Sequence, residues 1–141
     1  MLGDVAGLTV LDLFAGSGAL GIEALSRGAA TAVFVDRDAA AVACIRRNLA
    51  SLELTADVHR RDALSFLEAQ RGQAFSIVFL DPPYSSAGQL GPRLSQTLPP
   101  VVPDDGLIVS ESDRRQPLDL DLPLIRERIY GDTRIAFHRA R

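Results

Sequence analysis

A chain of 141 residues, 47% of them hydrophobic, can bury one hydrophobic core but is short for two, so we expect a single domain over residues 1–141. All 15 basic residues are arginine and 18 residues are acidic, and the net charge of −3 excludes the global positive charge of a general nucleic-acid binder. The single cysteine excludes an internal disulfide bond. Because the sequence has no apolar run of membrane-spanning length and no signal-peptide pattern, we expect a cytoplasmic protein outside the membrane.

Strand and helix patterns alternate along most of the chain. In chain order, the predicted elements are a strand at 8–13, a helix at 20–27, a strand at 32–35, a helix at 38–52, a strand at 56–60, a helix at 63–70, a strand at 75–80, a helix at 90–98 and a strand at 106–111. Gly91 and Pro92 weaken the start of the last helix. The alternation predicts a doubly wound α/β fold, with a mostly parallel sheet covered on both faces.

The pattern changes at the end of the chain. Residues 114–123 are polar and interrupted by prolines, which indicates a loop. Residues 124–130 and 134–139 flank a short Gly-Asp turn. Two segments this close predict a terminal antiparallel hairpin rather than another crossover helix.

A glycine-rich loop follows the first predicted strand. Residues 16–21 read G-x-G-x-x-G and open a predicted helix, which is the context that a nucleotide-binding loop requires. Glycines allow the tight turn and the close approach of a ligand to the backbone. Asp36 ends the second predicted strand and is placed to accept hydrogen bonds from ribose hydroxyls. The pattern suits the adenosine of either NAD or S-adenosylmethionine.

Two further carboxylates bear on the choice of ligand. Asp12 stands just before the loop, where a negative charge disfavours a pyrophosphate and favours a ligand with an amino group and a sulfonium. It could instead accept hydrogen bonds from loop N–H groups. Asp62 follows the third predicted strand and could accept a hydrogen bond from the adenine amino group, or cap the next helix.

The turn after the fourth predicted strand reads Asp81-Pro82-Pro83-Tyr84. An aromatic amino group is a poor nucleophile, and two acceptors that hold its hydrogens favour the form that attacks. The Asp81 carboxylate and the Pro82 carbonyl can be those acceptors, fixed in place by the prolines. Tyr84 could stack on a base lifted out of its helix. The alternative is an ordinary strand-ending turn.

The remaining polar residues give weaker signals. Paired arginines at 46–47, 60–61, 114–115 and 126 with 128 could form a local patch for a polyanion, or simply be solvated surface. His59 is expected to pack or to face solvent. The sequence has no cluster of histidine and cysteine with metal-ligand spacing, so we expect no metal site.

On these motifs the chain resembles the RsmD family, bacterial enzymes that methylate the exocyclic amino group (N2) of one guanine in small-subunit ribosomal RNA. The resemblance runs through residues 10–21, 23–29, 81–84 and 130–134. It implies a seven-stranded sheet with the last strand inserted antiparallel, S-adenosylmethionine as cofactor and ribosomal RNA of the small subunit as partner. We also expect a monomer.

The expected cofactor-binding residues are Asp12, Phe14, Ala15, Gly16, Ser17, Gly18, Asp36, Arg37, Asp62 and Ala63. The expected catalytic turn is Asp81, Pro82, Pro83 and Tyr84. One departure concerns the start of the chain: members of the family usually begin with a basic hairpin and a helix that carries an Arg-Pro-Thr segment, whereas this sequence opens almost on its first strand. We therefore expect a shortened form that lacks the segment contacting RNA and covering the cofactor.

Other functions share parts of these patterns. The Asp-Pro-Pro-Tyr turn also resembles that of DNA adenine or cytosine amino-methyltransferases, and a related Asn-Pro-Pro-Tyr turn serves protein glutamine methylation. An NAD-dependent oxidoreductase would use the same glycine pattern, but the sequence offers no evident acid or base for hydride transfer. A binding module without chemistry is the third alternative.

Overall fold

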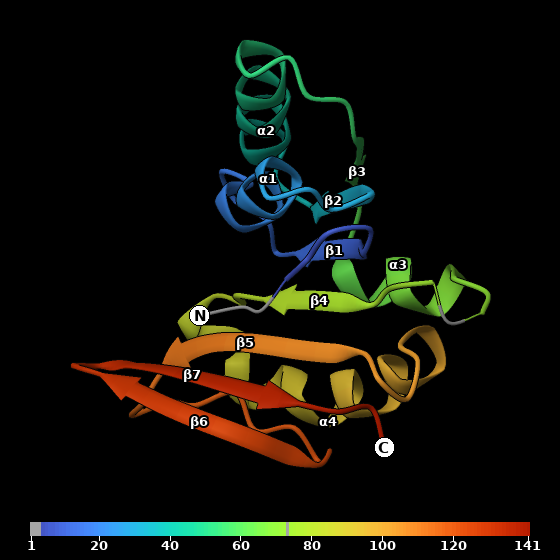
Figure 1. Ribbon diagram of the computed structural model, residues 1–141. Coiled ribbons are helices and arrows are strands. Elements are labelled where there is room, and N and C mark those ends of the chain that lie inside the picture. The colour runs from blue at the N-terminus through green and yellow to red at the C-terminus, as the bar shows by residue number, and fades with distance from the viewer. Residues whose placement is uncertain (1–3, 73) are drawn as a thin grey trace.

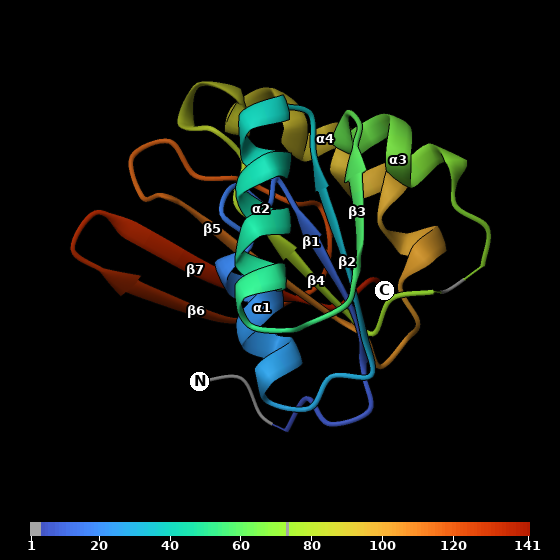
Figure 2. The ribbon, with the colours of Figure 1, turned by 90° about the horizontal axis from the view of Figure 1, so that it is seen from above.

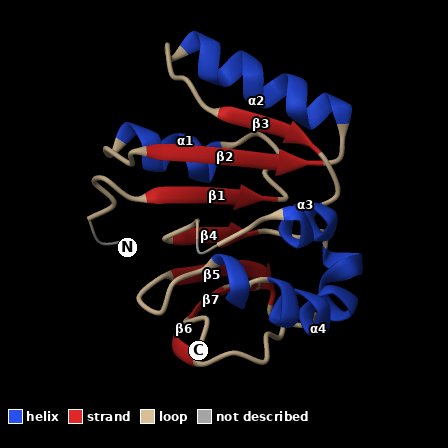
Figure 3. Cartoon of the chain, turned by 90° about the vertical axis from the view of Figure 1, so that its right-hand side faces the viewer, coloured by secondary structure: helices blue, strands red, loops and turns tan. Residues whose placement is uncertain are grey.

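The computed structural model describes residues 4–72 and 74–141, which build a seven-stranded sheet in the order β3-β2-β1-β4-β5-β7-β6. The strands are β1 (Thr9–Leu13), β2 (Thr31–Asp36), β3 (Asp57–Arg60), β4 (Ile77–Leu80), β5 (Leu107–Asp113), β6 (Leu124–Tyr130) and β7 (Thr133–His138). The first five strands run parallel (Figure 3), and β7 lies antiparallel between β5 and β6 (Figure 1). The expected doubly wound sheet with a terminal hairpin is confirmed.

Helices cover both faces of this sheet because side chains alternate along each strand. The helices are α1 (Ala19–Ser26), α2 (Ala39–Ser51), α3 (Ala63–Ala69) and α4 (Ala87–Thr97), with short 3₁₀ turns η1 (Tyr84–Ser86) and η2 (Pro99–Val101). One core lies under α1 and α2 and includes Phe34 and Phe79, and the other lies under α3 and α4 and includes Leu11 and Val78. Figures 1 and 2 show the two helix pairs on opposite sides of the sheet.

The strand order changes direction at β1, which lies between β2 and β4. Leu13 at the end of β1 is in register with Val35 of β2 and with Leu80 of β4. The loops that follow these three strands therefore meet at one edge of the sheet, and such a switch point is where open α/β sheets bind ligands. Asp36 and Asp81 are brought to this edge from distant parts of the sequence.

Helix α1 packs unusually close to the sheet, and the third glycine of the loop motif makes this possible. A Cβ atom on Gly21 would lie 2.5 Å from Cε1 of Phe34 on β2. Only a residue without a side chain fits at this contact. The first turn of α1 is thus held against the strands that carry the pocket.

Helix α4 departs from the sequence-based prediction, which placed its start at residue 90. It begins at Ala87 and contains both Gly91 and Pro92. The reason for Gly91 is tertiary: a Cβ atom there would lie 2.2 Å from the carbonyl oxygen of Asp119. The close approach of the 114–123 loop overrides the low helix propensity of glycine.

Among the described residues, no helix combines the length and the apolar composition needed to cross a bilayer.

Candidate active site

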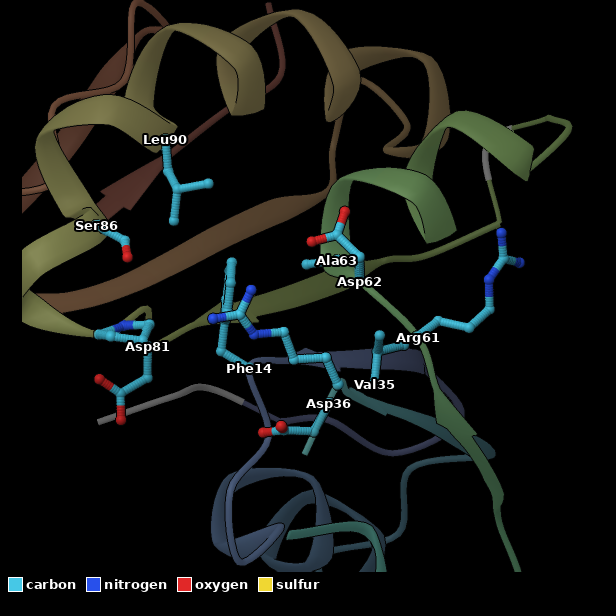
Figure 4. A pocket seen from close by; sticks show the side chains of 11 residues that line it. Phe14, Val35, Asp36, Arg61, Asp62, Ala63, Asp81, Ser86 and Leu90 are labelled. Atoms are coloured by element: carbon cyan, nitrogen blue, oxygen red, sulfur yellow. The ribbon is translucent and has the colours of Figure 1, made fainter. Parts of the chain in front are cut away.

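A pocket of about 190 Å³ opens at the carboxyl edge of the sheet, between the ends of β1, β2, β3 and β4 and the start of α4. It is lined by Phe14, Val35, Asp36, Arg37, Arg61, Asp62, Ala63, Asp81, Pro83, Ser86 and Leu90. Figure 4 shows the side chains of Asp36, Asp62 and Asp81 arranged around Phe14. Residues expected for cofactor binding and residues of the expected catalytic turn thus share one cavity.

The glycine loop makes a tight bend from β1 into α1. Phe14, Gly16 and Gly18 all adopt positive φ angles, of 58°, 59° and 81°. Such angles favour glycine, and a phenylalanine that adopts one is rare outside functional sites. The bend places the Phe14 ring in the pocket wall.

Protein acceptors already bind several amide groups of this loop. The Gly16 N–H donates to Oδ2 of Asp36 at 3.0 Å, and the Gly18 N–H donates to the carbonyl of Ala15 at 2.8 Å. The Gly21 N–H donates to Oδ2 of Asp12 at 3.0 Å. A pyrophosphate bound at a helix N-terminus relies on free amides of this kind. The loop is therefore poorly suited to the diphosphate of NAD.

Asp12 lies beneath the loop rather than in the pocket wall. Its side chain is only 2% exposed. Burial raises the pKa of Asp12 to about 7, the Gly21 N–H opposes this rise, and the carboxylates of Asp81 and Asp36 add to it. Of the two roles considered from the sequence, the structure shows Asp12 as an acceptor for a loop N–H.

Asp36 and Asp62 both line the pocket and both hold backbone in place. Asp36 accepts hydrogen bonds from the N–H groups of Gly16 and Asp38 with its two oxygens. Asp62 accepts from the N–H of Ser65 at 3.0 Å and caps α3, which is the alternative role considered from the sequence. A carboxylate has about four acceptor positions, so each retains capacity for a ligand hydroxyl or amino group.

The Asp-Pro-Pro-Tyr turn follows directly after Leu80, the last residue of β4. Pro82 is buried, and Pro83 lines the pocket while its carbonyl accepts the N–H of Ser86 at 3.0 Å to open η1. Within the described part of the chain, no residue donates a hydrogen bond to the Asp81 carboxylate or to the Pro82 carbonyl. The two acceptors that the sequence singled out are thus free to receive a ligand.

The surroundings of Asp81 also shift the pKa of its carboxyl group. Its carboxylate reaches the solvent-accessible wall of the pocket, yet partial burial raises its pKa, and the carboxylate of Glu111 on the neighbouring strand raises it further. A carboxylate with a raised pKa is a better proton acceptor.

The backbone of Tyr84 opens η1, whereas its side chain lies outside the described residues, so the expected stacking on a base stays a prediction.

The structure separates residues that line the pocket from residues that shape it. Of the expected residues whose side chains the structure describes, six do not line it: Asp12, Ala15, Gly16, Ser17, Gly18 and Pro82. Four lining residues were not expected: Val35, Arg61, Ser86 and Leu90. Val35 and Arg61 directly precede expected residues, so their positions could have been found. No sequence motif marks Ser86 and Leu90. They reach the pocket because α4 begins at Ala87 rather than at the predicted residue 90.

The remaining candidates have structural contacts. The ring of His59 packs on Phe66, with centroids 5.3 Å apart, as expected for a packing role. Arg60 donates to the carbonyl of Arg37. No group of three or more potential metal ligands occurs in the described ranges 4–72 and 74–141.

The strand order, the inserted antiparallel strand and the pocket beside a glycine loop define the class I methyltransferase fold. Two solved structures share it over 96% of this chain: HI0767 of Haemophilus influenzae, a candidate methylase by name, with a TM-score of 0.82 and 30% identity, and yhhF of Escherichia coli, a candidate methyltransferase by name, with a TM-score of 0.79 and 36% identity. They are covered over 88% and 76% of their own lengths.

The chain belongs to the family described as "Conserved hypothetical protein 95", whose model matches residues 1–139. Relatives named Ribosomal RNA small subunit methyltransferase D confirm the resemblance to the RsmD family. The Escherichia coli relative is 52% identical over 75 residues, which are 52% of this chain and 37% of that protein. YlbH of Bacillus subtilis, a candidate rRNA methyltransferase by name, is 44% identical over 143 residues, covering 93% of this chain and 75% of YlbH.

Proposed function

We propose that this protein transfers the methyl group of S-adenosylmethionine to the exocyclic amino group (N2) of a guanine in small-subunit ribosomal RNA. The observation that carries the proposal is the pocket shared by Asp36 and Asp81, in which a carboxylate suited to a nucleoside lies beside the first acceptor of the catalytic turn. The names of the relatives support ribosomal RNA as the substrate class.

The pocket suits S-adenosylmethionine by shape and by charge. Phe14, Val35 and Leu90 offer apolar surface for adenine, while Asp36 offers a carboxylate for ribose hydroxyls. The carboxylates of Asp36 and Asp81 both lie close enough to Asp12 to raise its pKa. Their combined negative potential attracts a cationic ligand and repels a dianionic pyrophosphate. When bound, the cofactor supplies a methyl group on a positively charged sulfur.

The chain's own residues then prepare the acceptor. Asp81 and the Pro82 carbonyl hold the hydrogens of the amino group, so that its lone pair faces the methyl group. With the cofactor bound, a carbon–nitrogen bond would form as the carbon–sulfur bond broke, and the electron pair of that bond would stay on sulfur. The extra proton on nitrogen leaves to the Asp81 carboxylate, whose raised pKa favours this acceptance. Positioning supplies most of the rate enhancement.

Two arginines at the rim of the pocket provide local positive charge for RNA on a protein whose net charge is negative. Arg37 and Arg61 are exposed and line the cavity beside Asp36 and Asp62. Guanidinium groups bind phosphate oxygens with several donors at once. We propose that these two side chains contact the RNA backbone next to the modified base.

Two measurements test the function. Calorimetry compares the binding of NAD with that of S-adenosylhomocysteine, the demethylated form of the cofactor. We expect binding of S-adenosylhomocysteine only; tight binding of NAD alone contradicts the cofactor. The protein is then incubated with radiolabelled S-adenosylmethionine and small ribosomal subunits from methylation-deficient cells, and labelled nucleotides are identified by mass spectrometry.

The product of the second assay separates the alternatives. N2-methylguanosine supports the proposal and allows the position of the modified guanine to be mapped. A methylated adenine or cytosine overturns the choice of base. Cofactor binding without transfer indicates the binding module.

A further inference from the structure

A second cavity, of about 100 Å³, lies on the α1 side of the sheet next to the catalytic turn. Its walls are largely apolar and include Leu20 of α1, Phe79 of β4, Val109 of β5 and Phe137 of β7. Among the described residues that line it, Glu111 is the one ionisable group. The mechanism proposed above makes no use of this cavity or of Glu111.

The sheet places Glu111 beside Asp81. Leu80 at the end of β4 is in register with Ser110 of β5, so the two acidic residues occupy the next positions on neighbouring parallel strands. Phe79 and Val109, two residues earlier on each strand, both line the second cavity. The two carboxylates lie close enough that Glu111 contributes to the raised pKa of Asp81.

Glu111 is half-buried and accepts no hydrogen bond from the residues that the structure describes. A partly desolvated carboxylate is costly unless donors satisfy it. Its neighbour across the antiparallel pair is Ile135, which offers no donor side chain. Glu111 thus has two free acceptor oxygens at the rim of an apolar cavity. They lie beside Asp81, which is proposed to hold a hydrogen of the amino group.

The bases differ in what they present to such a carboxylate. Guanine presents two adjacent donors, N1–H and one N2–H, whereas adenine and cytosine present an amino group beside a nitrogen lone pair. A carboxylate accepts a hydrogen bond from N1–H of guanine and repels the lone pair that adenine and cytosine present at the corresponding nitrogen. Single-stranded bases are read in this way on their Watson–Crick edges.

We infer that Glu111 selects guanine as the methyl acceptor, by accepting a hydrogen bond from N1–H. This inference rests on the proposed function and adds the residue that sets its base specificity. The two hydrogens of N2 stay with Asp81 and the Pro82 carbonyl, and the edge of the purine lies against the apolar rim formed by Leu20 and Ile135. The two carboxylates divide the work: Glu111 identifies the base and Asp81 prepares its nitrogen.

The test compares two acceptors in small subunits reconstituted with RNA that carries guanine or 2-aminopurine at the mapped position. 2-Aminopurine keeps the amino group but has a lone pair in place of N1–H. We expect the wild type to prefer guanine in kcat/KM by at least about tenfold, the discrimination typical of a hydrogen bond to a charged group. Glu111→Gln should lose most of this preference, because the amide can donate to the lone pair of 2-aminopurine and can accept N1–H of guanine.

Glu68→Gln is the matched control, since Glu68 forms an exposed ion pair with Arg93 on the α3 side of the sheet. It should keep the wild-type preference, and all three proteins should bind S-adenosylhomocysteine equally. An unchanged preference in Glu111→Gln overturns the inference and leaves the proposed function standing. Absence of transfer to guanine by the wild type overturns the proposed function, and this inference with it.

Discussion

The backbone N–H of Gly16 donates a 3.0 Å hydrogen bond to Oδ2 of Asp36, which lies 20 residues further along the chain. One carboxylate thus fixes the glycine loop and faces the pocket. Asp36→Ala removes both interactions, and we expect the dissociation constant of S-adenosylhomocysteine to rise at least tenfold, as for loss of a charged hydrogen bond. Asp57→Ala, an exposed change on β3, is the control for calorimetry. Equal affinities in the two variants would contradict the role of Asp36.

Asp81 should affect turnover rather than cofactor affinity. Asp81→Ala removes the proton acceptor, and we expect kcat for methyl transfer to fall by about 10²-fold or more, the usual contribution of a positioned base. The affinity for S-adenosylhomocysteine should stay within about twofold, because Asp36 and the apolar wall remain. Single-turnover transfer and calorimetry on the same sample measure the two quantities. Weakened binding with normal turnover would reverse the assignment.

The buried carboxyl group of Asp12 makes the stability of the fold depend on pH. Its pKa is about 7 in the folded chain and about 3.9 in an unfolded one. Between these values the folded state retains a proton that the unfolded state has released. The contribution of Asp12 to the free energy of unfolding therefore falls as pH rises through this window and is constant above it.

Asp12→Asn removes this titration and keeps an oxygen to accept the Gly21 N–H. The variant should gain stability over the wild type as pH rises from about 4 to about 7, by at most roughly 4 kcal/mol at about 1.4 kcal/mol per pKa unit. Urea denaturation at several pH values measures the difference. A difference that does not change with pH would show that Asp12 titrates normally.

Gly21 should tolerate no side chain. In Gly21→Ala the new Cβ meets the Phe34 ring at 2.5 Å, and we expect a loss of roughly 1–3 kcal/mol in the free energy of unfolding, as for overpacked cores. Gly88→Ala is the control, since a Cβ there meets no atom within 4 Å, and alanine in helix α4 should stabilise by about 0.5–1 kcal/mol. Chemical denaturation of both variants checks the pair. Partial rescue of Gly21→Ala by Phe34→Leu would locate the clash.

Much of the fold and the site could be predicted because the signals are local. The central parallel strands β1, β2 and β4 are short, mostly apolar runs, and Asp36 and Asp81 stand where two of these runs end. Once the switch point is set, strand ends must meet, so the shared pocket follows from topology. The expectations of one domain, a monomer and a cytoplasmic location stay predictions.

What could not be predicted depends on contacts between distant segments. Gly91 looks like a helix breaker in sequence, and only the carbonyl of Asp119 explains why glycine is needed inside α4. Asp62 illustrates a different limit: the same oxygens can cap a helix or bind a ligand, and the pattern of residue types is identical in both cases. No sequence motif marks Glu111, and only the register of β4 and β5 shows that it lies beside Asp81.

The glycine loop follows β1 and the proline turn follows β4. These two strands are hydrogen-bonded to each other along Val10 to Leu13 of β1. Neighbouring strands are held about 4.8 Å apart by their ladder of hydrogen bonds. The distance between the glycine loop and the proline turn is therefore set by the sheet. Under the proposed function, the two ligands would be aligned without a hinge closure, and the rate of the chemical step should be insensitive to solvent viscosity.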